Sequence, residues 1–256
     1  MIDKLERATT KLRNAIRELH RTEVRDERGE FLVEGPHACY ELLSGGLLPH
    51  VAVITEDVPH DVLAMVLQAQ QRGTQVVKSS PSELERMVTT RTAQGIVMVM
   101  PQFDERPLAG RIIALDGVSD PGNVGTIIRT AVWFGCTDVI LSHDCADVYN
   151  PKVVRSTAGA LAAVNIIRRA QLAELLTSMP EVEPLIPVAE GGMHPKELTL
   201  PMRWCLVIGS EAHGVSETVR NLARHRLTVP RVGSGVESLN AAVAASILLY
   251  ELAGRG

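Results

Sequence analysis

The stretch that decides the fold is LDGVSDPGNVGTIIRTAVWFGCTDVIL, residues 115–141. An apolar run ends in a glycine-containing loop, a helical pattern follows, and a second apolar run comes next, which is the order strand, loop, helix, strand. The loop holds Gly122, Asn123 and Gly125, and Arg129 lies in the helical pattern. The stretch has neither the GxGxxG spacing of dinucleotide-binding loops nor the Lys-Ser/Thr pair of a P-loop, so it does not favour dinucleotide or triphosphate binding.

Short apolar runs alternate with helical patterns through the rest of the second half of the chain. Strands are expected at residues 111–117, 138–142, 185–190, 204–210 and 226–230, and helices at 124–135 and 238–254. Nearly continuous apolar strands indicate an α/β fold with a parallel sheet covered by helices on both faces. Ligands bind such sheets beyond the carboxyl ends of the strands, so chemistry is expected in the loops that directly follow strands.

The first hundred residues indicate a smaller α/β domain. Strands are expected at 31–35, 50–55, 74–80 and 95–100, and helices at 36–46 and 61–73. Residues 101–110 carry two prolines, a glycine and several charges, which is typical of a linker. We therefore predict two domains, residues 1–104 and 105–256.

Residues 3–21 have leucines and isoleucines at helical spacing with lysines and arginines between them, which predicts an amphipathic helix with a basic face. Two interpretations stay open, a solvated face and an RNA contact, because Glu6 and Glu18 dilute the positive charge. The formal net charge of the chain is -4, so any attraction to nucleic acid must come from a local basic surface.

The four cysteines are widely spaced and form no CxxC pair, so we expect buried thiols, no metal site and a reducing, cytoplasmic setting. The first 21 residues lack the apolar core of a signal peptide, and no segment is long and apolar enough to cross a bilayer. We expect a soluble protein that does not contact a membrane.

A second loop, LVIGSEAHGVSE (206–217), follows another apolar run. Gly209 ends the expected strand, Glu211 lies just beyond it, and Gly214 precedes a helical pattern, so backbone donors and one carboxylate meet at the sheet edge. His213 is a candidate general base, but a lone histidine in a loop is more often exposed or structural, and we favour that interpretation.

A third loop lies in LTVPRVGSGVESLNAAVAASILLYEL (227–252). The strand ends at Pro230, a glycine-rich turn follows, and Ser238, Leu239 and Asn240 begin an alanine-rich helix. Taken alone, Ser238 could serve only as an N-cap.

In this order and at these spacings, the three loops resemble the three signature motifs of the SpoU (TrmH) family of RNA ribose 2′-O-methyltransferases, part of the SPOUT superfamily. The similarity is strong over residues 112–253, and residues 10–100 more loosely resemble the family's small substrate-binding domain. The matching positions are Asn123, Gly125 and Arg129 in the first motif, Gly209, Glu211 and Gly214 in the second, Pro230, Ser238, Leu239 and Asn240 in the third, and Arg155 and Ser156 between the first two motifs.

Two departures from the pattern stand out. Arg231 occupies the position after Pro230 where the family commonly has methionine, and the turn that follows is one residue longer than in many members. Ala93 stands where a histidine often precedes the Gln-Gly pair of the small domain.

The resemblance implies a C-terminal α/β knot, a deep trefoil knot that holds S-adenosylmethionine. The positions that match cofactor contacts are Ile208, Gly209, Gly214, Val229, Pro230 and Leu239. Those that match catalytic positions are Arg129, Asn123, Glu211, Ser238 and Asn240. It also implies a homodimer.

The implied reaction is attack of a ribose 2′-hydroxyl on the sulfonium methyl group. Arg129 is expected to stabilise the emerging alkoxide, because a guanidinium pKa above about 12 makes a general base costly. Ribosomal RNA is the favoured substrate, transfer RNA is the alternative, and a non-catalytic RNA-binding protein or a small-molecule enzyme is the rival function.

Overall fold

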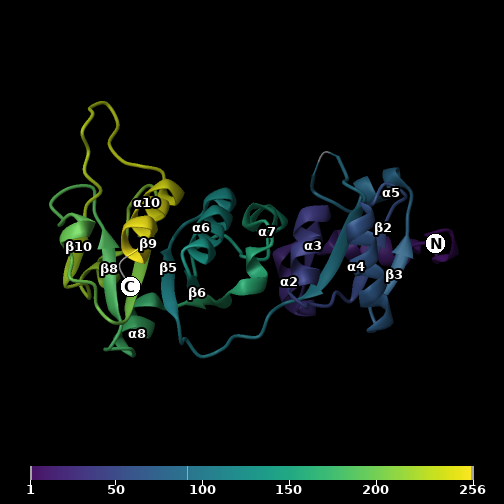
Figure 1. Cartoon of the computed structure of the whole chain (residues 1–256), viewed down its shortest axis with the longest axis horizontal. Helices are drawn as coiled ribbons and strands as arrows, with labels where there is room; N and C mark the ends of the chain where they lie inside the picture. The colour runs from purple at the N-terminus through teal and green to yellow at the C-terminus, as the bar shows by residue number, and fades with distance from the viewer. Residues whose placement is uncertain (1, 91, 255–256) are drawn as a thin grey trace. The chain divides into compact units, whose positions relative to one another are not determined.

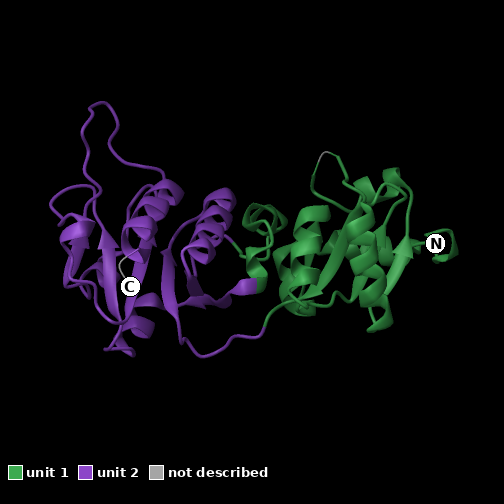
Figure 2. Ribbon diagram, viewed as in Figure 1, with its two compact units in different colours: residues 1–103, 147–162 green, residues 104–146, 163–256 purple. Residues whose placement is uncertain are grey.

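The computed structural model describes residues 2–90 and 92–254 (Figure 1). Two compact units make up the chain (Figure 2). The first comprises Met1–Phe103 together with Asp147–Ala162, and the second comprises Asp104–Ala146 together with Ala163–Gly256. Residues 102–110 lie between the strands Ile96–Pro101 and Arg111–Asp116 and have no regular secondary structure.

The first unit contains a four-stranded mixed sheet in the order β1-β4-β2-β3. Its strands are β1 (Glu30–Glu34), β2 (Val51–Ile54), β3 (Gln75–Lys78) and β4 (Ile96–Pro101). β4 runs antiparallel to β1 and β2, whereas β2 and β3 are parallel. The helices are α1 (Thr10–Glu18), α2 (Thr22–Arg28), α3 (Pro36–Ser44), α4 (His60–Gln71), α5 (Pro81–Glu85) and α7 (Pro151–Thr157), with a 3-10 turn η1 (Ile2–Lys4).

The start of the chain differs from the long helix expected at residues 3–21. α1 begins only at Thr10, where the Thr9 hydroxyl accepts a hydrogen bond from Leu12 N at 3.2 Å. The preceding residues pair with the edge of β3 instead: Lys78 N donates to Glu6 O at 2.8 Å, and Ala8 N donates to Lys78 O at 2.9 Å. A backbone that forms these sheet-edge bonds cannot also be helical.

Residues 147–162 pack with the first unit, although the sequence placed them in the second domain. Tyr149 stacks on Phe31 with ring centroids 4.6 Å apart. The buried Arg25 donates from Nε to Asp147 Oδ2 at 3.0 Å, and Arg155 Nη1 lies 2.7 Å from Glu34 Oε2. These partners are far apart in sequence, so local patterns carry no sign of the pairing.

The second unit contains a six-stranded sheet in the order β10-β8-β9-β5-β6-β7, and every neighbouring pair is parallel. The strands are β5 (Arg111–Asp116), β6 (Cys136–Ser142), β7 (Asn165–Ala170), β8 (Glu183–Pro187), β9 (Trp204–Gly209) and β10 (His225–Leu227). β7 was not predicted from the sequence, because its second half contains two arginines and breaks the apolar pattern. The predicted parallel sheet is confirmed.

Helices cover both faces of this sheet. α8 (Leu172–Thr177) and α9 (Glu217–Arg220) pack against one face, through a core that includes Ala114, Ile140 and Val207. α6 (Pro121–Trp133) and α10 (Ala241–Ala253) lie side by side (Figure 1). Two further 3-10 turns, η2 (Ala160–Ala163) and η3 (Pro195–Glu197), precede β7 and β9. No described helix is long and apolar enough to cross a membrane.

The cysteines form no disulfide. Cys39, Cys136 and Cys205 are buried, as expected, and Cys145 is half-buried. Burial raises the pKa of Cys136 to about 12 and raises that of Cys205 further, so these thiols stay protonated at neutral pH.

Candidate active site

The three motif loops follow β5, β9 and β10 at the carboxyl edge of the parallel sheet. In the first loop, Asp120 caps α6, since its Oδ1 accepts a hydrogen bond from Asn123 N at 2.9 Å. Because the aspartate caps the helix, the Asn123 side chain is left for other partners.

The Asn123 amide joins all three loops. Its Nδ2 donates to Glu211 Oε1 in the second loop, and its Oδ1 accepts from Asn240 Nδ2 in the third loop at 3.0 Å. The Asn240 Oδ1 in turn caps α10 by accepting from Ala242 N at 2.9 Å. An amide can do this because it carries both a donor and an acceptor, which neither a carboxylate nor an ammonium offers.

The second loop is a tight turn that requires its glycines. Ser210 and Gly214 exchange two backbone hydrogen bonds, of 3.1 and 2.9 Å, and Gly214 has a φ of +66°. A Cβ on Gly209 would overlap the backbone of Gly214 and Val215. Asp116 at the end of β5 fixes the far side of the turn by accepting from Ser216 N at 2.7 Å.

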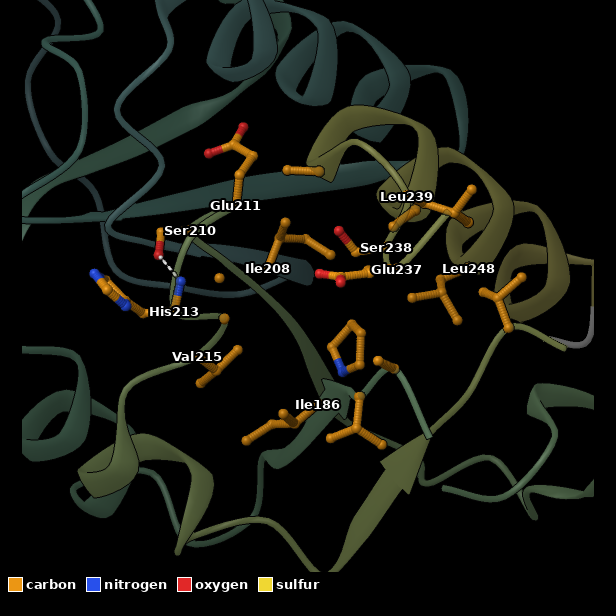
Figure 3. A pocket seen from close by; sticks show the side chains of 18 of the residues that line it. Ile186, Ile208, Ser210, Glu211, His213, Val215, Glu237, Ser238, Leu239 and Leu248 are labelled. Atoms are coloured by element: carbon orange, nitrogen blue, oxygen red, sulfur yellow. Dashed lines mark hydrogen bonds between the residues drawn. The ribbon is translucent and has the colours of Figure 1, made fainter. Parts of the chain in front are cut away.

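A cavity of about 510 Å³ lies beside this network (Figure 3). We call its two sides the inner wall and the outer wall. The inner wall is residues 186–189 and 208–215, at the carboxyl ends of β8 and β9 and just beyond them, and the outer wall is residues 230–240. Eight of the residues predicted for the site line it: Ile208, Gly209, Glu211, Gly214, Val229, Pro230, Ser238 and Leu239. Asn123 and Asn240 do not line the cavity, and they connect the loops through the hydrogen bonds of their side-chain amides.

Arg129, expected among the catalytic residues, lies about two turns into its helix, because α6 begins at Pro121 and Arg129 is its ninth residue. Its side chain is exposed and does not line the cavity. The network that joins the three loops is therefore formed without Arg129, whose side chain is exposed to solvent.

Several lining residues were not predicted from the sequence. Ile186 and Pro187 end β8, Val188 and Ala189 follow it, and Glu237 and Arg231 come from the outer wall. The strand at 185–190 was predicted, and the rule that ligands gather after parallel strands would have pointed to its end. His213 lines the cavity but is exposed, and its backbone N donates to Ser210 Oγ at 3.1 Å.

The cavity suits a cofactor that has an apolar body and carries charged groups of both signs. Its volume lies within the roughly 300–1,000 Å³ of small-molecule sites. Ile186, Ile208 and Leu248 supply apolar contacts. Glu211 and Glu237 supply negative charge, and Arg220 and Arg231 supply positive charge.

Comparisons with known proteins agree with this geometry. Residues 110–250 match the SpoU rRNA Methylase family, and residues 14–98 match the MRM3-like substrate binding domain. The chain belongs to the SpoU rRNA methylase family. It is therefore an RNA methyltransferase that uses S-adenosylmethionine, which confirms the predicted family, enzyme class and cofactor.

Individual relatives align over nearly the whole chain. The 23S rRNA (guanosine(2553)-2'-O)-methyltransferase RlmP of Bacillus subtilis is 32% identical over 244 residues, covering 93% of this chain and 94% of the relative. A TrmH-family structure from Porphyromonas gingivalis has a TM-score of 0.85 at 32% identity and covers 97% of this chain and 99% of that one. An AdoMet-bound rRNA methyltransferase from Sinorhizobium meliloti has a TM-score of 0.84 at 25% identity, with coverage of 97% and 96%.

These matches confirm the predicted fold class, a parallel sheet covered by helices with a small N-terminal α/β domain. The deep trefoil knot that the resemblance implies stays a prediction.

Proposed function

We propose that this SpoU-family enzyme methylates a ribose 2′-hydroxyl in ribosomal RNA. One observation carries the proposal: Asn123, Glu211 and Asn240, from three separate loops, form a single hydrogen-bonded network beside a cofactor-sized cavity. The relative from Bacillus subtilis, whose name gives a 23S rRNA 2′-O-methyltransferase, aligns with 93% of this chain and supports the substrate class.

The cavity residues would hold the cofactor. S-adenosylmethionine supplies an electrophilic methyl group on a positively charged sulfur. The peptide groups at Gly209, Val229 and Leu239 would hydrogen-bond to it, while Ile208 and Pro230 would pack against its apolar parts. Gly214 would keep the turn beside it closed. The carboxylates of Glu211 and Glu237 offset positive charge in the cavity.

Arg129 would act on the RNA. The 2′-oxygen would bond to the methyl carbon as the methyl–sulfur bond broke and the sulfur left as a neutral thioether. The hydroxyl proton would pass to a solvent water or a phosphate oxygen, and negative charge would grow on the 2′-oxygen as that proton left. A guanidinium near that oxygen or an adjacent phosphate stabilises this charge, and its high pKa argues against a role as base. Its exposure in the free chain fits a residue that contacts the substrate rather than the cofactor. Glu211, Ser238 and Asn240 would orient the loops around it.

We also propose that the enzyme is a homodimer joined through α6 and α10. Trp133 on α6 is 84% exposed, and Tyr250 and Val243 on α10 are 67% and 47% exposed. Exposed large apolar side chains on two adjacent helices are typical of a subunit interface. Light scattering on the wild type and on Trp133→Glu tests this: a wild type that is monomeric at micromolar concentration contradicts it.

The decisive experiment measures transfer of labelled methyl from S-adenosylmethionine to protein-free ribosomal RNA, ribosomal subunits and transfer RNA. Alkaline hydrolysis of the product follows, because a 2′-O-methyl group protects one phosphodiester bond. Label in ribosomal RNA with one protected bond is the expected result. Label in transfer RNA alone would show that transfer RNA, and not ribosomal RNA, is the substrate. Label without an alkali-resistant phosphodiester bond would show that the methyl group is not on a ribose 2′-oxygen.

The Arg129→Ala variant tests the division of labour within the site. We expect methyl transfer to be abolished while the Kd for S-adenosylmethionine, measured by calorimetry, stays within a few fold. Arg203→Ala, which removes another solvent-accessible arginine of the same unit, is the control and should keep full activity. Loss of cofactor binding together with activity in Arg129→Ala would contradict the assignment.

A further inference from the structure

The outer wall of the cavity, residues 230–240, has no buried apolar side chain. All of its residues, 230–240, are exposed, and Val232 and Val236 remain 101% and 64% exposed. Yet Pro230, Arg231, Val236, Glu237, Ser238 and Leu239 all line the cavity. In Figure 1 this loop, which leads into α10, extends away from the sheet. A segment without buried apolar contacts opens easily unless polar contacts hold it.

Polar contacts hold the outer wall at its two ends. At the carboxyl end, Asn240 bonds to Asn123 and caps α10. At the amino end, Arg231 Nη1 donates to Val236 O at 3.0 Å, and Arg231 Nη2 donates to Glu190 Oε1 at 3.2 Å. The first bond closes residues 231–236 into a ring, and the second ties that ring to the segment that follows the inner-wall residues 186–189.

The chemistry of arginine suits this double contact. A guanidinium presents several N–H donors in a fixed planar fork, so one side chain can hold a carbonyl and a carboxylate at once. A methionine, which the family resemblance leads one to expect at this position, has no donor. The longer glycine-containing turn of this chain is thus closed by a residue that the shorter pattern lacks.

We propose that Arg231 is a positioning residue for the cofactor: it closes the outer wall through Val236 and Glu190 and thereby raises the affinity for S-adenosylmethionine. The inference rests on the proposed function in taking this cavity as the cofactor site. Because both partners of the ion pair are more than half exposed, each contact is worth little alone, and the effect comes from their combination.

The test compares Arg231→Met, Arg231→Lys and Glu190→Gln in the full chain, with Arg224→Met as control. Arg224 is a matched exposed arginine, paired with Glu183 at 3.7 Å and outside the cavity lining. Calorimetry gives the Kd for S-adenosylmethionine, and amide hydrogen exchange reports opening of residues 231–240. We expect Arg231→Met to weaken binding about tenfold, the loss of about two modest hydrogen bonds, and to speed exchange in this loop.

The conservative variants separate positioning from direct contact with the cofactor. Lysine cannot make both bonds, so Arg231→Lys should weaken binding nearly as much as methionine does, and Glu190→Gln should weaken it about two- to threefold. The KM for S-adenosylmethionine should rise in each variant while kcat at saturation stays within about twofold. Full rescue by lysine, with Glu190→Gln unchanged or tighter, would overturn the proposal in favour of a direct charge contact.

Separate results would overturn the role of Arg231 and the assignment of the cavity as the cofactor site. A wild type that binds S-adenosylmethionine, with Arg231→Met equal to it in Kd and exchange, overturns the role of Arg231 alone. A wild type that binds no S-adenosylmethionine overturns the assignment of the cavity, and the role of Arg231 with it.

Discussion

The two walls of the cavity are built in opposite ways. The inner wall consists of strand ends: Ile186 and Ile208 are buried, and the backbone at Gly209 leaves no room for a Cβ. The outer wall is an exposed loop held at its ends by Arg231 and Asn240. On the proposed assignment of the cavity, the sheet fixes where the cofactor lies, whereas the loop sets how tightly it is covered. Substitutions should therefore be severe in the inner wall and graded in the outer wall.

Gly209→Ala should have the largest effect. The added methyl group meets the backbone of Gly214 and Val215, which cannot move without breaking the Ser210–Gly214 turn. We expect the affinity for S-adenosylmethionine to fall about 100-fold or more and the free energy of unfolding to fall by about 1–3 kcal/mol. Calorimetry and urea denaturation measure the two quantities.

Gly233→Ala is the matched control in the outer wall. A Cβ at Gly233 meets nothing within 4 Å. Its affinity and stability should stay at wild-type values, and equal losses in the two alanine variants would break the contrast between the walls.

Asn123→Ala should have an intermediate effect, because it removes the link between the walls. Glu211 and Asn240 both lose a partner, and one of these hydrogen bonds involves a charged group. At about 1.5–3 kcal/mol for such a bond, kcat/KM should fall about 10- to 100-fold in a methyl-transfer assay. Thr126→Ala, an exposed position on the same helix, should be neutral; full activity of Asn123→Ala would mean that the network does not matter.

The smallest expected effect is on the pH dependence of the free energy of unfolding, through Cys205 on the buried strand β9. Burial raises the pKa of Cys205 on β9, so above pH 9 the unfolded chain loses a proton that the folded chain keeps. The free energy of unfolding should therefore fall as the pH rises above about 9. Cys205→Ala should reduce this slope in denaturation series between pH 7 and 10, and an unchanged slope would show that Cys205 does not contribute to it.

The sequence determined the parts of this protein that depend on local patterns. Alternating apolar runs predicted nine of the ten strands, and the loops after them carried Asn123, Glu211 and Asn240 in an order that identified the family. Strand periodicity, turn glycines and helix caps arise from neighbours in the chain, so they can be read from the chain. The missed strand, β7, ends in Arg168, Arg169 and Ala170, which breaks the apolar pattern.

Only the tertiary structure decided which distant residues meet. It made Asn123 the junction of three loops, left Arg129 exposed, added residues 186–189 to the cavity, and packed residues 147–162 against β1 through Tyr149. The N-terminal helix lost its first residues to the edge of β3 for the same reason. Such contacts join residues tens to more than a hundred positions apart, and their energies depend on burial and geometry that no local window contains.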